Sequence, residues 1–273
     1  MKLNRILICC VNYNSYDQLI IYLDSIEKAV ENVKGLTAVK VVVCDNSSQI
    51  ENINIEKYKL FELEILINDN LGYLGASLQA INKTNLLIFD YVIISNVDVI
   101  LSETFFVDLH NNIINSDIAW IAPSIFSLKE KKDINPKMLN RLSLKKIKIL
   151  LFLYSNPWLY NVYENSIYKL KTRKKNNQNH LMKEIYAGHG SFMIFNSEFL
   201  YNNSPLNFFS FLFGEEIFFA EMALKNNMKV IYDPKIIVYD LEHISTGKLK
   251  GKDYCKLNYD SILKIRELYY EQN

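Results

Sequence analysis

The chain is poor in cysteine and lacks any long apolar run. These absences argue against a disulfide-stabilised protein, a cysteine metal site and a membrane-spanning protein. Three of its four cysteines (Cys9, Cys10 and Cys44) lie inside strand-like apolar stretches and Cys255 stands alone, so neither a disulfide framework nor metal-ligand spacing is present. No stretch approaches the roughly 20 apolar residues of a membrane-spanning helix, and the first apolar run is too short for a signal peptide. We expect a cytoplasmic protein with buried thiols in a reducing compartment.

Internal repeats and low-complexity linkers are also missing. With 49% hydrophobic and 22% charged residues, the composition is that of a folded globular protein. Its 273 residues leave room for one large domain or two small ones with a substantial core.

Apolar, strand-like runs alternate with amphipathic helical patterns along the first half of the chain. The expected strands are 6–11, 39–44, 63–67, 91–94 and 118–122, and the expected helices are a long one opened by Ser15, one ending near Asn82 and one over 103–115. Gln18 is placed to form a capping box with Ser15. This alternation predicts a parallel-dominated α/β sheet.

The stretch 91–101, Y-V-I-I-S-N-V-D-V-I-L, is the centre of this pattern. A four-residue apolar strand breaks into a polar turn that carries Asp98, just past the carboxyl end of the strand. Ligands of open α/β sheets bind at such ends, and a carboxylate there is a candidate ligand for a hard divalent cation. The alternative is a turn whose Asn96 and Asp98 only terminate the strand.

The second half of the chain holds shorter elements. Strands are expected at 184–187, 191–195, 229–232 and 236–241, and helices at 197–201, 217–226 and 254–270. The Glu215-Glu216 pair precedes the second of these helices.

Between the two halves, residues 127–183 differ in charge from the rest. They contain 14 Lys and Arg but 3 Asp and Glu, a net charge of +11, beside an aromatic-rich apolar stretch over 147–163. Such a combination is typical of an interfacial contact with an anionic membrane surface. The alternative is a solvated basic helical subdomain. No nucleic-acid-binding module is recognisable, so we expect no nucleic-acid partner.

Seven short motifs follow one another along the chain: N-Y-N (12–14), V-V-V-C-D-N-S-S (41–48), N-D-N-L-G-Y-L-G (68–75), S-N-V-D-V (95–99), G-H-G-S-F-M-I-F (188–195), F-G-E-E (213–216) and E-H-I-S-T-G-K (242–248). Their order and spacing resemble a family 2 glycosyltransferase with the GT-A fold, and the resemblance covers nearly the whole chain. It is closest to the bacterial branch that builds surface polysaccharides, including rhamnosyltransferase-like members.

The resemblance implies a fold and a division of the chain. The fold is a mixed, mostly parallel sheet flanked by helices, with a basic helical insertion. One domain, 1–273, would comprise a nucleotide-sugar-binding half (1–126), the basic aromatic-rich insertion (127–183) and an acceptor-binding half with the C-terminal helix (184–273).

It also implies a metal, Mn²⁺ or Mg²⁺, that neutralises the leaving diphosphate as a Lewis acid. Asp98 matches the metal-ligating acidic residue of the family's DXD motif. Asn96 stands where many relatives have the first Asp of this motif. The resemblance therefore implies only that Asn96 contacts the ribose, or contacts the metal through a water molecule. His243 matches a histidine that ligates the metal or touches the diphosphate in some relatives, although a lone histidine is also often structural. Further phosphate contacts would come from Ser245, Thr246 and Lys248.

The donor nucleotide would be held at the ends of the first three strands. Asp45 matches the family's contact to the base or ribose, beside Asn12 and Tyr13. Matches to the glycine-rich turn near the nucleotide are Asn70, Gly72 and Gly75. Ser77 and Leu78 follow where the family often has Asn, so this turn does not identify the donor sugar.

The acceptor hydroxyl needs a general base. Glu215-Glu216 matches the family's E-D pair, in which the second residue is usually the base, so Glu216 is the predicted base and Glu215 its support. The alternative is a pair of carboxylates that only stabilise a helix N-terminus. Gly188 and Gly190 would let the chain pass near the acceptor, with His189 as a contact.

The sequence therefore predicts an inverting glycosyltransferase that uses a UDP- or dTDP-sugar and extends a glycan or lipid-linked glycan of a bacterial surface polysaccharide. The protein would be peripheral on the inner face of the cell membrane. Two alternatives remain: a catalytically inactive membrane-surface module with the same fold, and a nucleotidyltransferase. A nucleotidyltransferase would need a basic, glycine-rich loop after the first strand, where this chain has N-Y-N-S-Y-D.

Overall fold

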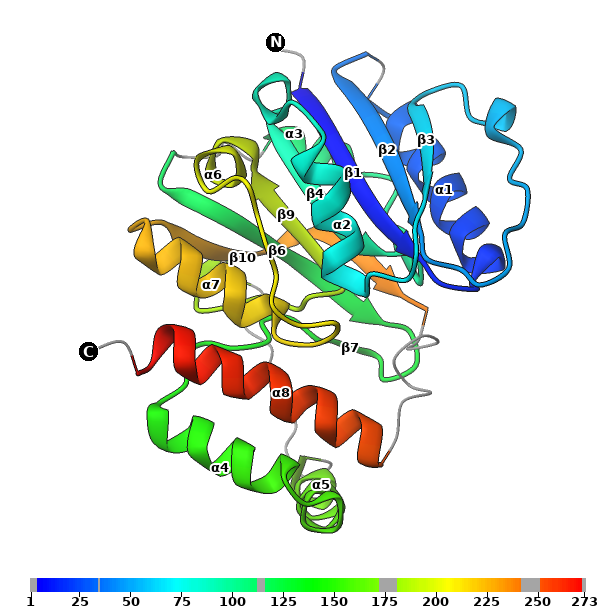
Figure 1. Cartoon of the computed structure of the whole chain (residues 1–273). Helices are drawn as coiled ribbons and strands as arrows, with labels where there is room; N and C mark the ends of the chain where they lie inside the picture. Colours follow the sequence, from blue (N-terminus) through cyan, green and yellow to red (C-terminus); the bar gives the residue numbers. More distant parts are fainter. Residues whose placement is uncertain (1–3, 34, 112–115, 172–180, 242–250, 272–273) are drawn as a thin grey trace.

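A single mixed sheet with helices on both faces forms the body of the protein (Figure 1). The computed structural model describes residues 4–33, 35–111, 116–171, 181–241 and 251–271. The strands are β1 (Asn4–Asn12), β2 (Thr37–Asp45), β3 (Glu62–Ile67), β4 (Tyr91–Asn96), β5 (Val99–Leu101), β6 (Ile118–Ser127), β7 (Lys132–Asp133), β8 (Lys183–Ile185), β9 (Phe192–Asn196) and β10 (Lys229–Asp240). The helices are α1 (Tyr16–Glu31), α2 (Tyr73–Asn82), α3 (Phe105–Asn111), α4 (Leu144–Tyr154), α5 (Pro157–Lys171), α6 (Ser197–Asn202), α7 (Glu215–Lys225) and α8 (Lys252–Tyr269).

The strand order is β3-β2-β1-β4-β9-β6-β10-β5, with β7 on β6 and β8 on β10. β3, β2, β1 and β4 are parallel, as the alternation of strands and helices predicts. β9 is inserted antiparallel between β4 and β6, and β10 runs parallel to β6. The predicted fold class, a mostly parallel α/β sheet flanked by helices with a helical insertion, is confirmed.

Each central strand is buried on both faces because helices cover both sides of the sheet. In β1, Ile6 and Ile8 belong to the core beneath α1 and α3, whereas Leu7 and Cys9 belong to the core shared with α2, α6 and α7. This explains why the strands read as continuous apolar runs. The four cysteines are all buried and unpaired, as expected.

Two local predictions are wrong. Ser15 precedes α1 but makes no side-chain cap, because its backbone (φ −136°, ψ 50°) departs from the extended conformation of a capping residue; its hydroxyl donates to the carbonyl of Tyr13 (3.1 Å). The strands expected at 229–232 and 236–241 form one strand, β10, whose register on β6 shifts between Asp233 and Ile237. Pro234, which has no N–H to donate, lies within this irregularity.

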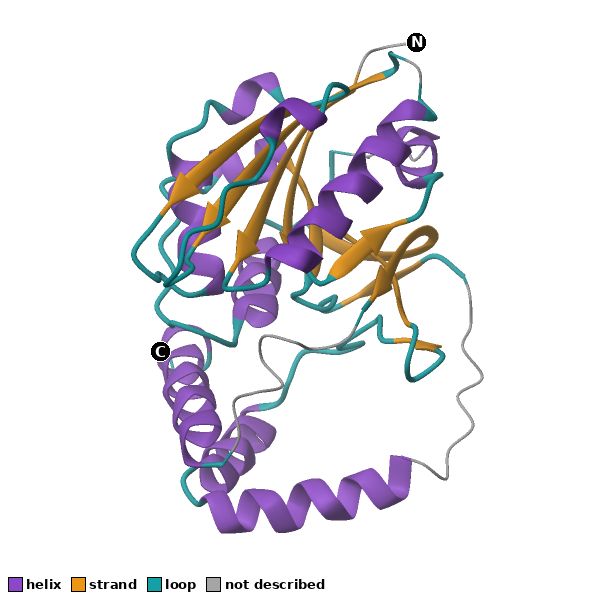
Figure 2. Ribbon diagram, turned by 90° about the vertical axis from the view of Figure 1, so that its right-hand side faces the viewer, coloured by secondary structure: helices purple, strands orange, loops and turns teal. Residues whose placement is uncertain are grey.

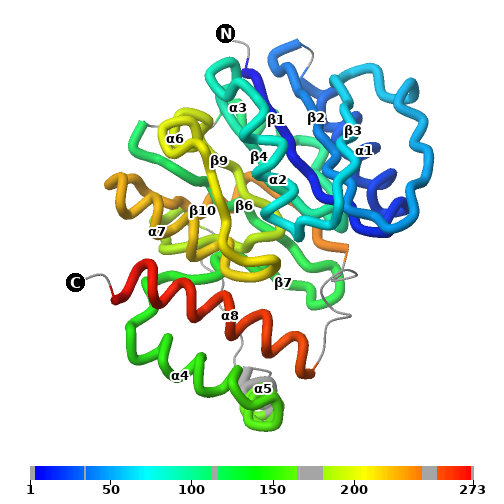
Figure 3. The backbone as a smooth tube through the Cα atoms, viewed as in Figure 1, coloured from blue at the N-terminus to red at the C-terminus, as the bar shows by residue number. Residues whose placement is uncertain are grey.

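The predicted insertion folds as two helices, α4 and α5, which pack with α8 into a helical layer beside one end of the sheet (Figure 2). The chain passes from β6 through β7 into these helices and returns to the sheet at β8 (Figure 3). Arg141, before α4, ties the layer to α7 by a two-pronged ion pair with buried Glu221 (2.7 and 2.9 Å). No helix within the described residues is long and apolar enough to cross a membrane.

Candidate active site

The carboxyl ends of the parallel strands meet at one edge of the sheet. Asn12 of β1 is in register with Asp45 of β2, and Val11 is in register with Asn96 of β4. Ile67, the last residue of β3, also pairs with Asp45. The polar loops that follow these strands are therefore neighbours in space, as the sequence predicts.

The buried carboxylate of Asp45 is the centre of a hydrogen-bond network at this edge. Its carboxylate accepts hydrogen bonds from the Tyr16 hydroxyl (2.5 Å), the Asn12 amide (3.2 Å) and the backbone N–H of Ser47 (3.0 Å). Desolvation and the bond to Asp45 raise the pKa of Tyr16. Asp45 and Asn12 are both buried behind the surface rather than on it. Direct contact of Asp45 or Asn12 with a nucleoside stays a prediction, and it would require the hydrogen bonds around Asp45 to break.

The glycine-rich turn lies against a distant segment of the chain. Gly72 has φ +76°, and a Cβ added to it would lie 2.0 Å from the carbonyl oxygen of Phe211. The Asn46 amide donates to the Gly72 carbonyl (3.0 Å), while Asn46 Oδ1 is buried without a hydrogen-bond partner among the described residues. Only glycine fits this turn. Gly75 lies one turn inside α2.

Asp98 lies in the two-residue turn between β4 and β5, as the sequence predicts, and is buried but borders the cavity described below. Its carbonyl accepts the N–H of Leu241, at the end of β10. This bond brings Asp98 next to Asp240. His243, Ser245, Thr246 and Lys248 lie outside the described residues.

The G-H-G loop follows β8 and faces the same edge. His189 donates its backbone N–H to Asn135 (2.7 Å), and its Nδ1 accepts the N–H of Ser191 (3.2 Å). Gly190 lies directly against Glu215, whose side chain would collide with any Cβ there. Gly188 packs instead on Trp120 and Ala122, so its small size serves the core and not a ligand.

Glu215 and Glu216 form the first turn of α7 and face the cavity. Phe213 (φ +67°) and Gly214 (φ +93°) precede them in left-handed conformations, which are unfavourable for a bulky residue such as Phe213. Ser261 of α8 holds this turn by donating to the Phe213 carbonyl (2.8 Å). Glu216 Oε1 accepts the N–H of Gly190 (3.2 Å). Burial, with the neighbouring charge of Glu216, raises the pKa of Glu215 to about 8.

These elements enclose a cavity of about 1050 Å³. Its sheet-edge wall consists of Tyr13, Asn14, Ser15, Asn46, Asn70, Gly72, Asn96 and Asp98. The helical wall consists of Tyr160, Asn161 and Glu164 from α5, Tyr254 and Leu257 from α8, and Phe211–Phe213. His189, Gly190, Glu215 and Glu216 lie between the two walls.

The cavity is acidic. Five carboxylates line it (Asp98, Glu164, Glu215, Glu216 and Asp240) against one cationic side chain, Lys137, among the described residues. A diphosphate would be repelled here without a counter-charge. No three described His, Cys, Asp or Glu side chains form a closed metal site. Mg²⁺ characteristically binds through one or two carboxylates together with substrate phosphates. The Asp98 carboxylate in an acidic, partly open cavity fits a divalent cation held jointly with a ligand.

Among the predicted site residues, the structure brings Tyr13, Asn70, Gly72, Asn96, Asp98, His189, Gly190, Glu215 and Glu216 to one cavity. Sequence reasoning missed the helical wall and Asp240. One sequence signal could have pointed to this wall: Glu164 is the only acidic residue of α4 and α5, two otherwise basic helices. Nothing in the local sequence marked Tyr254, and Phe213 entered only as part of the F-G-E-E motif.

No family model matches the sequence, and no curated protein matches it either. Solved structures do match the fold. GalNAc-T7, crystallised with UDP, GalNAc and Mn²⁺, superposes with a TM-score of 0.62 at 10% identity, over 99% of this chain and 50% of that chain. The mannosyltransferase PcManGT from Pyrobaculum calidifontis, in complex with GDP-Man and Mn²⁺, gives 0.53 at 13% identity, over 90% and 59%.

TarS 1-349 from S. aureus gives a TM-score of 0.51 at 13% identity, over 100% of this chain and 74% of that chain. This chain thus spans about half the length of the GalNAc-T7 chain and somewhat more of the mannosyltransferase. At these identities the similarity concerns the fold alone. The protein has the GT-A fold of nucleotide-sugar glycosyltransferases.

Proposed function

We propose that the protein is a metal-dependent, inverting glycosyltransferase that moves a sugar from a nucleoside diphosphate to a glycan or lipid-linked glycan acceptor. One observation carries the proposal: a single cavity joins the polar strand ends and Asp98 on one side to the Glu215-Glu216 pair on the other. UDP- and dTDP-sugars are the proposed donors, and a bacterial surface polysaccharide (O-antigen, capsule or lipooligosaccharide) is the proposed product. The neighbours GalNAc-T7 and PcManGT, with their nucleotides and Mn²⁺, support the donor class and the metal.

The sheet-edge wall would hold the nucleotide. Tyr13, whose side chain is 47% exposed, and Asn46, whose buried Oδ1 has no hydrogen-bond partner among the described residues, both line this wall. Asp98 would bind Mn²⁺ or Mg²⁺ together with the diphosphate, with Asn96 beside it and His243 as a further proposed ligand. The cation supplies the charge that neutralises the leaving diphosphate.

Glu216 is the proposed general base. Its carboxylate would take the proton of the acceptor hydroxyl as that oxygen attacks the anomeric carbon. The bond from that carbon to the phosphate oxygen breaks, its electron pair leaves with the diphosphate, and attack from the opposite face inverts the configuration. Because its raised pKa keeps Glu215 protonated near neutral pH, it would act as a hydrogen-bond donor beside Glu216.

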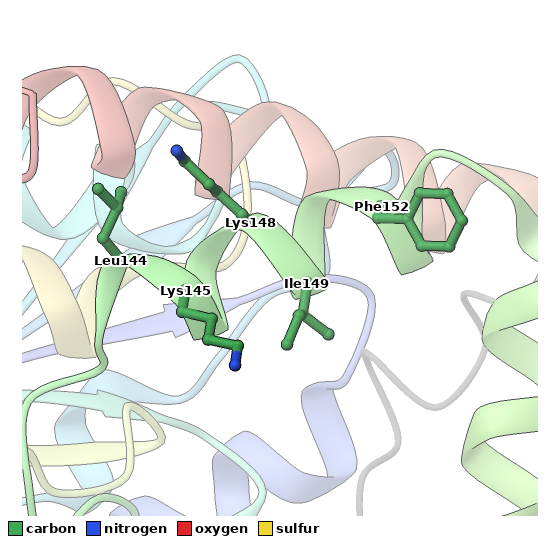
Figure 4. Close-up of a pocket in the computed structure, with 5 residues that line it drawn as sticks. All are labelled: Leu144, Lys145, Lys148, Ile149 and Phe152. Atoms are coloured by element: carbon green, nitrogen blue, oxygen red, sulfur yellow. The ribbon is translucent and has the colours of Figure 1, made fainter.

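We also propose that the outer face of α4 rests on an anionic membrane surface. Lys145 and Lys148 are exposed beside Ile149 and Phe152, whose exposed fractions are 47% and 64% (Figure 4). Apolar side chains flanked by lysines are suited to the boundary between acyl chains and anionic headgroups. This placement would bring the helical layer, and with it the cavity, close to a lipid-linked acceptor.

A thermal-shift panel tests the donor site. Melting is followed with UDP, dTDP, GDP and CMP, each with and without Mn²⁺. A ligand of the native state raises the melting temperature with the logarithm of its concentration over its dissociation constant. We expect a rise for UDP or dTDP that requires Mn²⁺. Melting that responds to none of the nucleotides would contradict the proposal.

A further inference from the structure

The helical wall of the cavity has an aromatic surface with a polar rim. Tyr160 of α5 stacks on Tyr154 of α4, with ring centroids 5.1 Å apart, and lies 5.5 Å from Tyr254 of α8. Tyr254 in turn meets Phe213 edge-on at 5.3 Å. The helices of the insertion are therefore joined by ring contacts to the residue two positions before Glu215.

Oxygen groups gather at the edge of these rings. The Tyr160 hydroxyl lies 3.3 Å from Glu164 Oε1 and 3.5 Å from the Tyr254 hydroxyl. Both Glu164 and Asn161 line the cavity within one turn of Tyr160. An apolar aromatic surface bordered by hydroxyl, amide and carboxylate groups matches a ligand with an apolar C–H face and a rim of hydroxyls.

The two helices of the insertion present different charges. Lys145, Lys146 and Lys148 of α4 are exposed, whereas Glu164, the one carboxylate of α4 and α5, lines the cavity; Lys137, which precedes α4, lines the cavity as well. A carboxylate accepts hydrogen bonds only, and it repels phosphate. The wall is therefore suited to a neutral polyhydroxylated group and unsuited to the diphosphate, whose place is beside Asp98 at the other wall.

We propose that Tyr160, Glu164 and Tyr254 form a subsite for a pyranose ring of the acceptor. The ring packs its C–H face on the tyrosines, and Glu164 accepts hydrogen bonds from two of its hydroxyls. This inference rests on the proposed glycosyl transfer and deepens it, because it makes the basic insertion part of the acceptor site. Phe213 links the occupied subsite to the turn that carries Glu215 and Glu216.

Saturation-transfer NMR on the full chain tests the subsite. The probes are methyl glycosides of glucose, galactose, mannose, rhamnose, N-acetylglucosamine and N-acetylgalactosamine at millimolar concentration. We expect at least one to bind the wild type, with the strongest transfer to its ring C–H protons. Tyr160→Ala should weaken binding about 3- to 10-fold through loss of the aromatic surface. Glu164→Gln should weaken it about 10-fold, because a charged acceptor is lost.

Tyr163→Ala is the matched control, since Tyr163 lies on the same helix but does not line the cavity. Tyr160→Phe, which keeps the ring, should retain most of the binding, and Glu164→Gln keeps the test valid if Tyr160→Ala does not fold. The proposal is overturned if no glycoside binds the wild type, if a folded Tyr160→Ala binds as the wild type does, or if Glu164→Gln binds as the wild type does.

The melting shift with nucleoside diphosphate and Mg²⁺ is measured on the same samples. It shows whether a failed test concerns the acceptor subsite or the proposed donor site. It should be unchanged in every helical-wall variant. A weaker nucleotide shift in Tyr160→Ala would assign the wall to the donor and overturn the subsite. Absence of the shift in the wild type, with glycoside binding intact, would instead contradict the donor site alone.

Discussion

The two walls of the cavity are built in different ways. The sheet-edge wall consists of loops that directly follow parallel strands, so the register of β1, β2 and β4 alone brings its residues together. The helical wall combines α5, α8 and the segment before α7, and ring contacts among Tyr160, Tyr254 and Phe213 hold it. Backbone hydrogen bonds of the sheet thus position the sheet-edge wall, whereas side-chain packing holds the helical wall. The sheet-edge wall would suit a nucleotide shared by many donors, and the helical wall an acceptor that differs from one enzyme to another.

Replacing Glu216, the proposed base, where the two walls meet should have the largest effect. Glu216→Gln keeps the shape and the hydrogen bond from Gly190 but cannot accept a proton, so we expect turnover to fall about 10²- to 10⁴-fold. The nucleotide-dependent melting shift should persist. Release of nucleoside diphosphate from the donor sugar nucleotide measures turnover. A fully active variant would remove Glu216 from the chemistry.

Breaking the ion pair between Arg141 and Glu221, which joins the helical layer to α7, should have the second largest effect, a loss of stability. Arg141→Met leaves buried Glu221 with the Tyr186 hydroxyl but without its cation. We expect the free energy of unfolding to fall by about 3 kcal/mol, the lower end for a broken buried pair because Arg141 is partly exposed. Denaturant titration measures this loss. Lys264→Met, which breaks an exposed pair with Glu267, is the control and should change little.

The raised pKa of Glu215 gives the stability of the protein a definite pH dependence. In the unfolded chain this carboxyl ionises near pH ~4.3, whereas in the folded protein it holds its proton until about 8. Between these values the folded state binds the extra proton, so the stability that Glu215 contributes is lost as pH rises. Glu215→Gln removes that loss.

Relative to the wild type, Glu215→Gln should gain about 2 kcal/mol between pH 5 and pH 8, less than the full shift implies because solvent reaches the half-buried group. Denaturant titrations at both pH values measure the gain. A difference that does not change with pH would contradict the raised pKa.

The smallest effect is expected at the outer face of α4. Replacing Lys148 by Ala should weaken binding to vesicles that contain phosphatidylserine by about 1 kcal/mol. Sedimentation with the vesicles measures binding, and added salt should weaken the binding of the wild type. Lys225→Ala on α7, away from this face, is the control. Equal binding to neutral vesicles would refute the electrostatic contact.

The sequence predicts the sheet-edge wall better than the helical wall, for a physical reason. Strand periodicity is local, so the positions of Asp98 and Asn96 at the end of a strand follow from the pattern of β4 alone. The same holds for Glu215 and Glu216, which begin a recognisable helix. In contrast, Tyr160 and Tyr254 are 94 residues apart in sequence, and only tertiary packing brings them together. Even near β1, the missing side-chain cap at Ser15 could not be foreseen, because it follows from the backbone conformation of that residue (ψ 50°), which cannot be read from the residue types.

Calorimetric titration of UDP or dTDP, whichever the melting panel selects, tests the central claim most directly. The titration is run with and without Mn²⁺ on the wild type, on Asp98→Asn and on Asp117→Asn, a control whose exposed carboxylate pairs with Lys229 on the surface. We expect Mn²⁺-dependent binding to the wild type and the control, and its loss in Asp98→Asn. Equal binding to all three proteins, or binding indifferent to Mn²⁺, would contradict a metal-assisted nucleotide site at this edge of the sheet.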